Sequence, residues 1–170
     1  ELAATLRETA EKGVLRADAT MPAFVLPDSN GELVSSDTLL ATGPLVVVFF
    51  RGGWCPFCRT TLAALNELQP ELAALGVNMV AISPEAGEYA AELSNETGLC
   101  FPVLSDIDGA VGILFGTMFR VPDKLRKFYL WAGIDLTQRT GDQAWFLPMP
   151  AAFVVDAHGV VRHVHVSGDI

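Results

Sequence analysis

Two of the three cysteines in the sequence, Cys55 and Cys58, are separated only by Pro56 and Phe57. The thiolate is the nucleophilic form of cysteine, and an unperturbed thiol with a pKa of about 8.5 is mostly protonated at neutral pH. Unpaired N–H groups and the helix dipole favour an ionised sulfur at a helix N-terminus, and proline suits the first helical position. The spacing places the second sulfur one turn further along. The motif therefore predicts a redox-active dithiol at the start of a helix.

The same pair of cysteines could instead form half of a zinc site, which needs four ligands. The other candidate ligands are Cys100, His158, His163 and His165, and the last two alternate along one predicted strand, so a Cys₂His₂ set is conceivable. The C-x-x-C motif follows a buried strand and leads into a helix, whereas zinc knuckles need tight turns. We expect no metal and no cofactor, and we expect Cys100 to be an inert core cysteine and the histidines to lie on the surface.

The segments around the dithiol predict an α/β architecture. Residues 45–50 are apolar throughout, as in a strand that is covered on both faces. Leucines at helical spacing over residues 62–75 form an apolar stripe, in a helix that Pro70 should kink and Gly76 should end. Residues 77–83 form the next strand. This β-α-β unit implies a right-handed crossover between parallel strands.

The flanking segments complete this arrangement. Asn30-Gly31 is a strong signal for a β-hairpin, and Ser36-Asp37 could cap a short helix. The remaining expected elements are helices at 1–17, 85–97 and 108–115, a strand at 101–105, an irregular insert at 116–147 with one helix near 124–131, and a closing hairpin of 150–156 and 160–166.

The composition limits the classes of protein to which the chain can belong. With 170 residues, 51% of them hydrophobic, the chain is long enough for one domain with a substantial core. A net charge of −9 argues against binding nucleic acid or anionic membranes, and no apolar run reaches the roughly 18–20 residues of a membrane helix. Two cysteines in one motif plus a single further cysteine favour a reducing compartment, so we expect a cytoplasmic protein.

Several motifs together resemble the alkyl hydroperoxide reductase/thiol-specific antioxidant family, in its peroxiredoxin-like branch that carries a C-x-x-C motif. The likeness covers about residues 20 to 166. The motifs are Val47-Val-Phe-Phe-Arg-Gly-Gly-Trp-Cys-Pro-Phe-Cys-Arg59, Val80-Ala-Ile-Ser-Pro84, Phe101-Pro-Val-Leu-Ser-Asp-Ile-Asp-Gly109, Phe119-Arg-Val-Pro-Asp-Lys-Leu125, Gly133-Ile-Asp-Leu136 and Pro150-Ala-Ala-Phe-Val-Val-Asp156.

This resemblance implies a thioredoxin-like fold, in which helices flank a central mixed β-sheet, with an N-terminal extension and an insert before the closing hairpin. Residues 1–170 would form a single domain. A domain of this kind normally closes with one more helix, so we expect the C-terminal helix to be missing from the sequence.

The resemblance also implies roles for individual residues. The family pattern, Pro-x-x-x-Thr-x-x-Cys, places the peroxidatic cysteine on Cys58, the threonine on Cys55 and the proline on Arg51, so two of its three positions differ here. An active-site arginine would have to be Arg51, Arg59, Arg120 or Arg139. Supporting roles fall to the residues beside the dithiol, Trp54 and Pro56, and to Pro150, which resembles the cis-proline of thioredoxins.

Three functions follow as hypotheses. The first is a thiol-dependent peroxidase, in which the Cys58 thiolate reduces hydrogen peroxide or an organic hydroperoxide and becomes a sulfenic acid. Cys55 then forms a disulfide with it, which a thioredoxin-like or low-molecular-weight thiol reduces. The second is a protein disulfide reductase or electron carrier with Cys55 as the nucleophile, and the third is a redox-sensing module without enzymatic activity. By analogy with the family, a homodimer is also compatible with the sequence.

Overall fold

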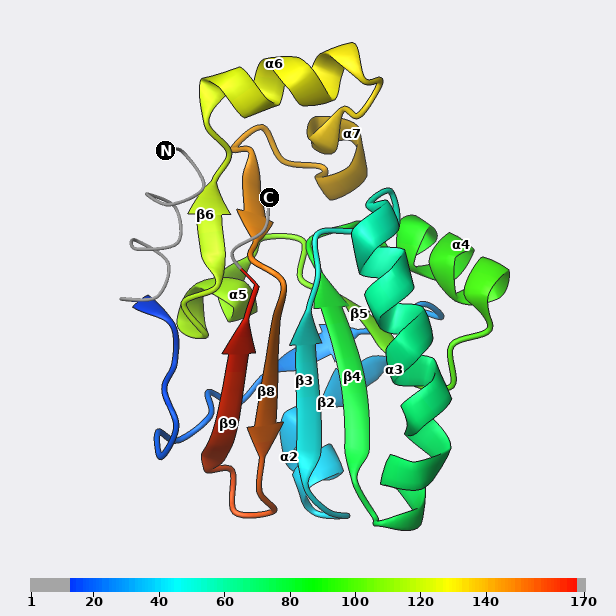
Figure 1. The fold of residues 1–170 in the computed structure, drawn as a ribbon, viewed down its shortest axis with the longest axis vertical. Coiled ribbons are helices and arrows are strands. Elements are labelled where there is room, and N and C mark those ends of the chain that lie inside the picture. The colour runs from blue at the N-terminus through cyan, green and yellow to red at the C-terminus, as the bar shows by residue number, and fades with distance from the viewer. Residues whose placement is uncertain (1–12, 168–170) are drawn as a thin grey trace.

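The computed structural model describes residues 13–167, so most of the helix predicted for residues 1–17 lies outside the described residues. A five-stranded mixed sheet occupies the centre, in the order β5-β4-β3-β8-β9 (Figure 1). The strands are β1 (Val25–Pro27), β2 (Leu33–Ser35), β3 (Leu45–Phe49), β4 (Asn78–Ser83), β5 (Val103–Ser105), β6 (Met118–Arg120), β7 (Phe146–Pro148), β8 (Ala151–Val155) and β9 (Val161–Val166). The helices are α2 (Ser36–Leu40), α3 (Pro56–Ala74), α4 (Gly87–Thr97), α5 (Ala110–Leu114), α6 (Asp123–Trp131) and α7 (Leu136–Thr140).

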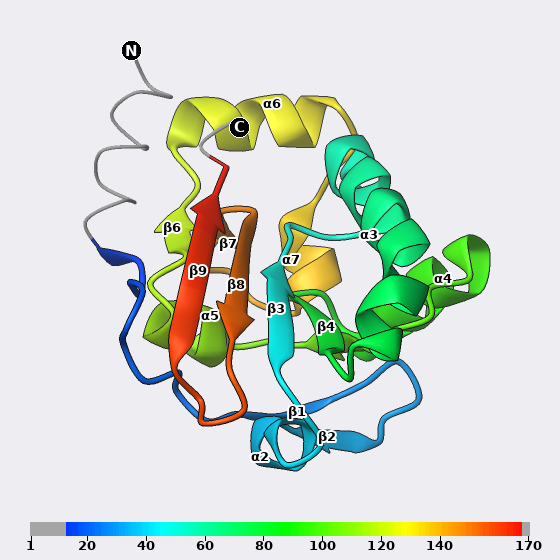
Figure 2. The ribbon, with the colours of Figure 1, turned by 60° about the horizontal axis from the view of Figure 1, so that its bottom comes forward.

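Strand β3 is the central strand, and all five of its residues are buried. Successive side chains of a strand point to opposite faces of the sheet, so β3 contributes to two cores. Leu45, Val47 and Phe49 pack in the core that includes Phe115 of the α5 region. Alternate residues, beginning with Val46, pack in the core that contains both cysteines of the motif and residues of α3 and α4. Figure 2 shows α3 and α4 lying together beside the sheet.

The strand connections confirm the predicted β-α-β unit. β3 and β4 are parallel, in a register that runs from Leu45 opposite Asn78 to Phe49 opposite Ile82, and α3 forms the crossover between them. β8 pairs antiparallel with β3, and β9 pairs antiparallel with β8 to close the sheet. The predicted hairpin around Asn30-Gly31 is also present, as the antiparallel pair β1 and β2. The expected class, a mixed sheet flanked by helices, is therefore confirmed.

α3 runs from Pro56 to Ala74 with Pro70 inside it. One local prediction about a helix was wrong. Ser36 does not cap α2: the N-cap is Ser35, and the Ser36 hydroxyl accepts a 3.0 Å hydrogen bond from the backbone N–H of Phe24. Ser36 is therefore a buried link between α2 and the segment that leads into β1.

The insert, expected to be irregular apart from one helix, is more ordered than predicted. β6 and β7 form a separate antiparallel pair, and α6 and α7 lie between them in the chain. These helices cover the end of the sheet where β3 leads into α3 (Figure 1). The insert has its own small core, consisting of Val121, Tyr129, Leu136, Trp145 and Leu147. No helix within residues 13–167 is both long and apolar enough to span a membrane.

Candidate active site

The two cysteines of the motif lie where the sequence predicted them, at the N-terminus of α3. Cys55 is the N-cap residue, Pro56 is the first helical residue, and Cys58 lies in the first turn. Both cysteines are buried. Proline has no N–H to leave unpaired in the first turn, and its fixed φ suits the helix start. Cys55 itself joins the helix ladder, since its carbonyl accepts a 3.0 Å hydrogen bond from the N–H of Arg59.

The two thiols form one electrostatic unit. The pKa of Cys55 is lowered to about 6, chiefly because the Cys58 thiol donates a hydrogen bond to it; burial opposes this shift, while the backbone N–H of Cys58 and the positive charge of Arg51 add to it. Conversely, the pKa of Cys58 is raised, because its proton is held in the hydrogen bond to Cys55 and because it is buried. At neutral pH the reduced pair therefore carries one negative charge and shares one proton.

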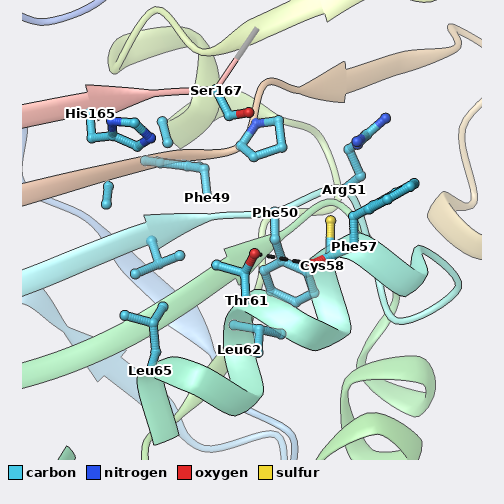
Figure 3. A pocket seen from close by; sticks show the side chains of 14 residues that line it. Phe49, Phe50, Arg51, Phe57, Cys58, Thr61, Leu62, Leu65, His165 and Ser167 are labelled. Atoms are coloured by element: carbon cyan, nitrogen blue, oxygen red, sulfur yellow. Dashed lines mark hydrogen bonds between the residues drawn. The ribbon is translucent and has the colours of Figure 1, made fainter. Parts of the chain in front are cut away.

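A pocket of about 520 Å³ opens beside Cys58. Its lining is mainly apolar and comes from α3, β3, β8 and β9, and it includes Phe57, which is 77% exposed. Figure 3 shows the Cys58 sulfur and the Arg51 guanidinium projecting into the same end of this pocket. Of the two cysteines in the motif, only Cys58 is among the residues that line the pocket. A small molecule in the pocket would therefore meet Cys58 first.

The structure separates the four arginines that were candidates for this site. Arg51 is buried and lines the pocket with Cys58. Arg59 instead donates to the Gly53 carbonyl at 3.3 Å and forms a surface ion pair with Glu96. The other two lie in the insert: Arg120 borders a separate cavity, and Arg139 reaches the buried carboxylate described next.

Glu85 is a residue of this region that the sequence analysis missed. It is 1% exposed, and its Oε2 accepts a 2.6 Å hydrogen bond from the N–H of Gly53, while Oε1 accepts a 2.8 Å hydrogen bond from Arg139. The carboxylate packs so closely on the loop that a Cβ at Gly52, where φ is +147°, would lie 2.7 Å from Glu85 Cδ. Only its position directly after the Val80–Pro84 motif could have drawn attention to it.

Tyr129 of α6 is a second residue that the sequence analysis missed. Its ring packs edge-on against Trp54, with centroids 5.2 Å apart. Burial raises the pKa of Tyr129, and the positive charge of Arg51 partly offsets that shift. Trp54, one of the predicted supporting residues, thus lies between the dithiol motif and the insert. A tyrosine in a helix more than 70 residues from the motif carries no sequence signal for this contact.

Two predictions about individual residues are corrected by the structure. No peptide bond in the described part of the chain is cis, so Pro150 is a trans proline; it joins β7 to β8, its carbonyl accepts a 2.8 Å hydrogen bond from Ser167, and it borders the pocket. Cys100 is exposed rather than buried in the core. It precedes β5 and is held by its backbone N–H, which donates to Asn66 Oδ1 at 2.7 Å, so its side chain is left at the surface.

The alternative zinc ligands do not gather around the motif. All three histidines are exposed, as predicted. Within residues 13–167, no three side chains of the types that bind metal ions lie close enough together to hold one.

A mixed sheet with a dithiol at the start of the helix that follows its central strand defines the thioredoxin fold. The model of the AhpC/TSA family matches residues 17–164, and the chain belongs to this family. It is 27% identical to peroxiredoxin Bcp of Escherichia coli over 150 residues, which cover 88% of this chain and 85% of Bcp.

Two further similarities complete the comparison. The chain is 31% identical to the thiol-disulfide oxidoreductase ResA of Bacillus thuringiensis over 98 residues, 57% of this chain and 56% of ResA. The crystal structure of peroxidoxin BcpB from Mycobacterium tuberculosis superposes with a TM-score of 0.75 at 23% identity, covering 91% of this chain and 88% of that one. The chain spans 66% and 60% of the length of two curated putative peroxiredoxins of Mycobacterium tuberculosis that it matches.

Proposed function

We propose that this protein is a thiol-dependent peroxidase in which Cys58 attacks the peroxide and Cys55 resolves the product. The observation that carries this proposal is the pocket beside α3, whose lining residues include Cys58 and Arg51 but not Cys55. Membership of the AhpC/TSA family supports the same chemistry.

The proposed reaction begins when the Cys58 thiolate bonds to one peroxide oxygen and the O–O bond breaks. The products are a sulfenic acid on Cys58 and, after protonation, an alcohol or water. The Cys55 thiol then displaces the sulfenic hydroxyl as water and forms the Cys55–Cys58 disulfide. A thioredoxin-like or low-molecular-weight thiol restores the two thiols by exchange. We place this cycle in the cytoplasm, where such reductants keep thiols reduced, and we propose a homodimer by analogy with the family.

The proton shared by the two thiols explains how Cys58 can attack a peroxide although Cys55 has the lower pKa. The negative charge resides mainly on Cys55, whereas the pocket reaches Cys58. Transfer of the shared proton from Cys58 to Cys55 requires no movement beyond their hydrogen bond, and it produces a Cys58 thiolate that faces the peroxide. It also leaves Cys55 as the neutral thiol that the second step needs.

The test uses reduced protein carrying Cys100→Ser, so that the dithiol supplies every thiol. One equivalent of hydrogen peroxide or cumene hydroperoxide should consume two thiols, faster than it oxidises free cysteine, and mass spectrometry should find a peptide pair joined through Cys55 and Cys58. A rate no faster than that of free cysteine with both peroxides would overturn the proposal.

The lowered pKa of Cys55 favours a second candidate function, reduction of protein disulfides. A thiolate at a helix N-terminus is suited to attack on a disulfide, and the similarity to ResA points the same way. In that reaction Cys55 would attack and Cys58 would resolve. Turnover of insulin disulfides that is abolished by Cys55→Ser, together with no reaction toward either peroxide, would establish this function in place of the first.

A further inference from the structure

The turn that leads into the dithiol is held by side chains from outside it. The N–H of Cys55 donates to the Gly52 carbonyl at 3.2 Å, so the chain turns directly before α3. Gly53 lies inside this turn: its N–H donates to Glu85 Oε2 at 2.6 Å, and its carbonyl accepts a 3.3 Å hydrogen bond from Arg59. The backbone that carries the dithiol into α3 is therefore anchored at Gly53.

Glu85 is the stronger of these two anchors. Its side chain is buried, and a carboxylate that accepts from a backbone N–H forms a charge-assisted hydrogen bond, which is about twice as strong as a neutral one. Arg59 is partly exposed, its bond to Gly53 is longer, and its guanidinium also pairs with Glu96 at the surface. Loss of the Glu85 contact should therefore release the turn more than loss of the Arg59 contact.

Glu85 is itself fixed by the end of the sheet and by the insert. It follows β4, which pairs with the central strand β3, and its own N–H donates to Ser83 Oγ at 3.4 Å. The N–H of Ala86 donates to the Arg139 carbonyl at 2.8 Å, and the Arg139 guanidinium donates to Glu85 Oε1 at 2.8 Å. Because both carboxylate oxygens are bonded, the acceptor for Gly53 has a defined position on a rigid element.

The loop leaves no room for a further side chain between itself and this carboxylate. A Cβ at Gly52 would lie 2.7 Å from Glu85 Cδ and 2.6 Å from Trp54 Nε1. The φ of Gly52 is +147°, a conformation that residues with a Cβ rarely adopt. Glycine at this position therefore permits the close approach on which the Glu85 contact depends.

We propose that Glu85 is a positioning residue, which holds the turn before the dithiol through the Gly53 N–H and so places Cys58 at the end of the peroxide pocket; this inference rests on the proposed peroxidase function. Glu85 acts through the backbone of Gly53 and not through contact with the peroxide. Attack on a peroxide requires a defined distance and alignment between sulfur and oxygen, and a displacement of about 1 Å can lower the rate about 100-fold.

Two substitutions separate the position of the Glu85 oxygen from its charge. Glu85→Gln keeps an acceptor oxygen at the same reach and removes the charge, whereas Glu85→Asp keeps the charge and withdraws the oxygens by one methylene group. The rate of thiol oxidation by cumene hydroperoxide is measured in the Cys100→Ser background. We expect the rate of the Gln variant to stay within about threefold of the parent and that of the Asp variant to fall at least about tenfold.

The pH dependence of iodoacetamide alkylation gives a second readout, which needs no peroxide. A displaced turn weakens the contacts that lower the pKa of Cys55 to about 6, so the Asp variant should be alkylated at higher pH than the parent. Removal of a nearby negative charge cannot raise the pKa of a thiol, so the Gln variant should not show this shift. The direction of the shift therefore distinguishes a positional effect of Glu85 from an effect of its charge.

Ser36→Ala is the matched control, because it also removes a buried acceptor of a backbone N–H, in α2 at the opposite end of the sheet from the dithiol (Figure 1). Its oxidation rate and alkylation profile should equal those of the parent. A Gln variant as slow as the Asp variant, or an Asp variant as fast as the parent, would overturn the role of Glu85. If the parent reacts with the peroxide no faster than free cysteine, the peroxidase function fails, and the alkylation profiles alone decide whether Glu85 positions the dithiol.

Discussion

The carboxylate of Glu85 accepts a 2.6 Å hydrogen bond from the backbone N–H of Gly53, two residues before Cys55. Its second oxygen binds Arg139 of α7 at 2.8 Å. One buried side chain therefore joins the segment after β4 to the loop that presents the dithiol and to the insert. This contact explains how an insert far along the chain can fix the geometry of the motif.

Glu85→Ala should lower the free energy of unfolding in urea by about 3 kcal/mol, because it leaves the Gly53 N–H without its acceptor and Arg139 without its counterion. The matched control is Glu96→Ala, which removes the ion pair of Arg59 at the surface. Exposed pairs contribute little, so this change should cost less than about 1 kcal/mol. Equal losses of unfolding free energy in the two variants would show that the buried contact of Glu85 stabilises the protein no more than the surface ion pair of Glu96 does.

The lowered pKa of Cys55 depends mainly on the hydrogen bond from Cys58. In the Cys100→Ser background, Cys58→Ala should therefore raise the pKa of Cys55 from about 6 by at least about one unit. Cys58→Ser retains a hydroxyl donor and should leave the pKa low. The pH dependence of iodoacetamide alkylation reports the value for the single remaining thiol. A low pKa of Cys55 in the Cys58→Ala variant would mean that the helix N-terminus and Arg51 lower this pKa without help from Cys58.

The stability of the reduced protein should depend on pH in a defined direction. The pKa of Cys55 is about 6 in the folded protein, against an ordinary value near 9, so between these values the unfolded chain binds more protons. The free energy of unfolding should therefore rise by up to about 4 kcal/mol from pH 6 to pH 9, and this stability is lost as the pH falls through 6. Above pH 9 it should fall again, because folded Cys58 keeps a proton that the unfolded chain releases.

Urea unfolding across this range tests the pH dependence, with the Cys55→Ala/Cys58→Ala double variant as the control for all other titrating groups. The difference in the free energy of unfolding between the two proteins should rise from pH 6 to pH 9 and fall above pH 9. A difference that is flat from pH 6 to pH 9 would contradict the assignment of a shared proton to the pair.

The apolar pocket should favour bulky hydroperoxides. Leu65 lines it, whereas Leu68, on the same helix, is 49% exposed and does not. Leu65→Lys should raise the KM for cumene hydroperoxide by about tenfold and leave that for hydrogen peroxide nearly unchanged, while Leu68→Lys should alter neither. Steady-state assays with a thiol reductant measure both constants. An equal change in KM for the two peroxides would show that the organic hydroperoxide does not bind in this pocket.

Local sequence signals were sufficient to predict the centre of the fold and the position of the dithiol. The run that forms β3 is apolar on both faces because α3 and α5 cover opposite sides of it. Pro56 and the leucine stripe define α3 without reference to distant residues. The parallel pairing of β3 with β4 then follows from chain connectivity.

The remaining parts of the site depend on contacts between distant segments. Tyr129 approaches the motif because the insert folds over the end of the sheet, and Glu85 approaches it because β4 lies beside β3. No periodicity or spacing indicates either contact. Cys100 looked buried because apolar residues follow it, but β5 begins three residues later, at Val103. The choice among the four arginines was likewise decided by tertiary structure.

The measurement that tests the central claim most directly is the trapping of a sulfenic acid in single-cysteine variants. Cys55→Ser and Cys58→Ser, each combined with Cys100→Ser, are treated with one equivalent of cumene hydroperoxide and a dimedone-type reagent, and the adduct is located by mass spectrometry. We predict rapid formation of the adduct on Cys58 in the Cys55→Ser protein and no adduct above the rate of free cysteine in the Cys58→Ser protein. Rapid formation on Cys55, with Cys58 unreactive, would contradict the assignment of Cys58 as the attacking thiol.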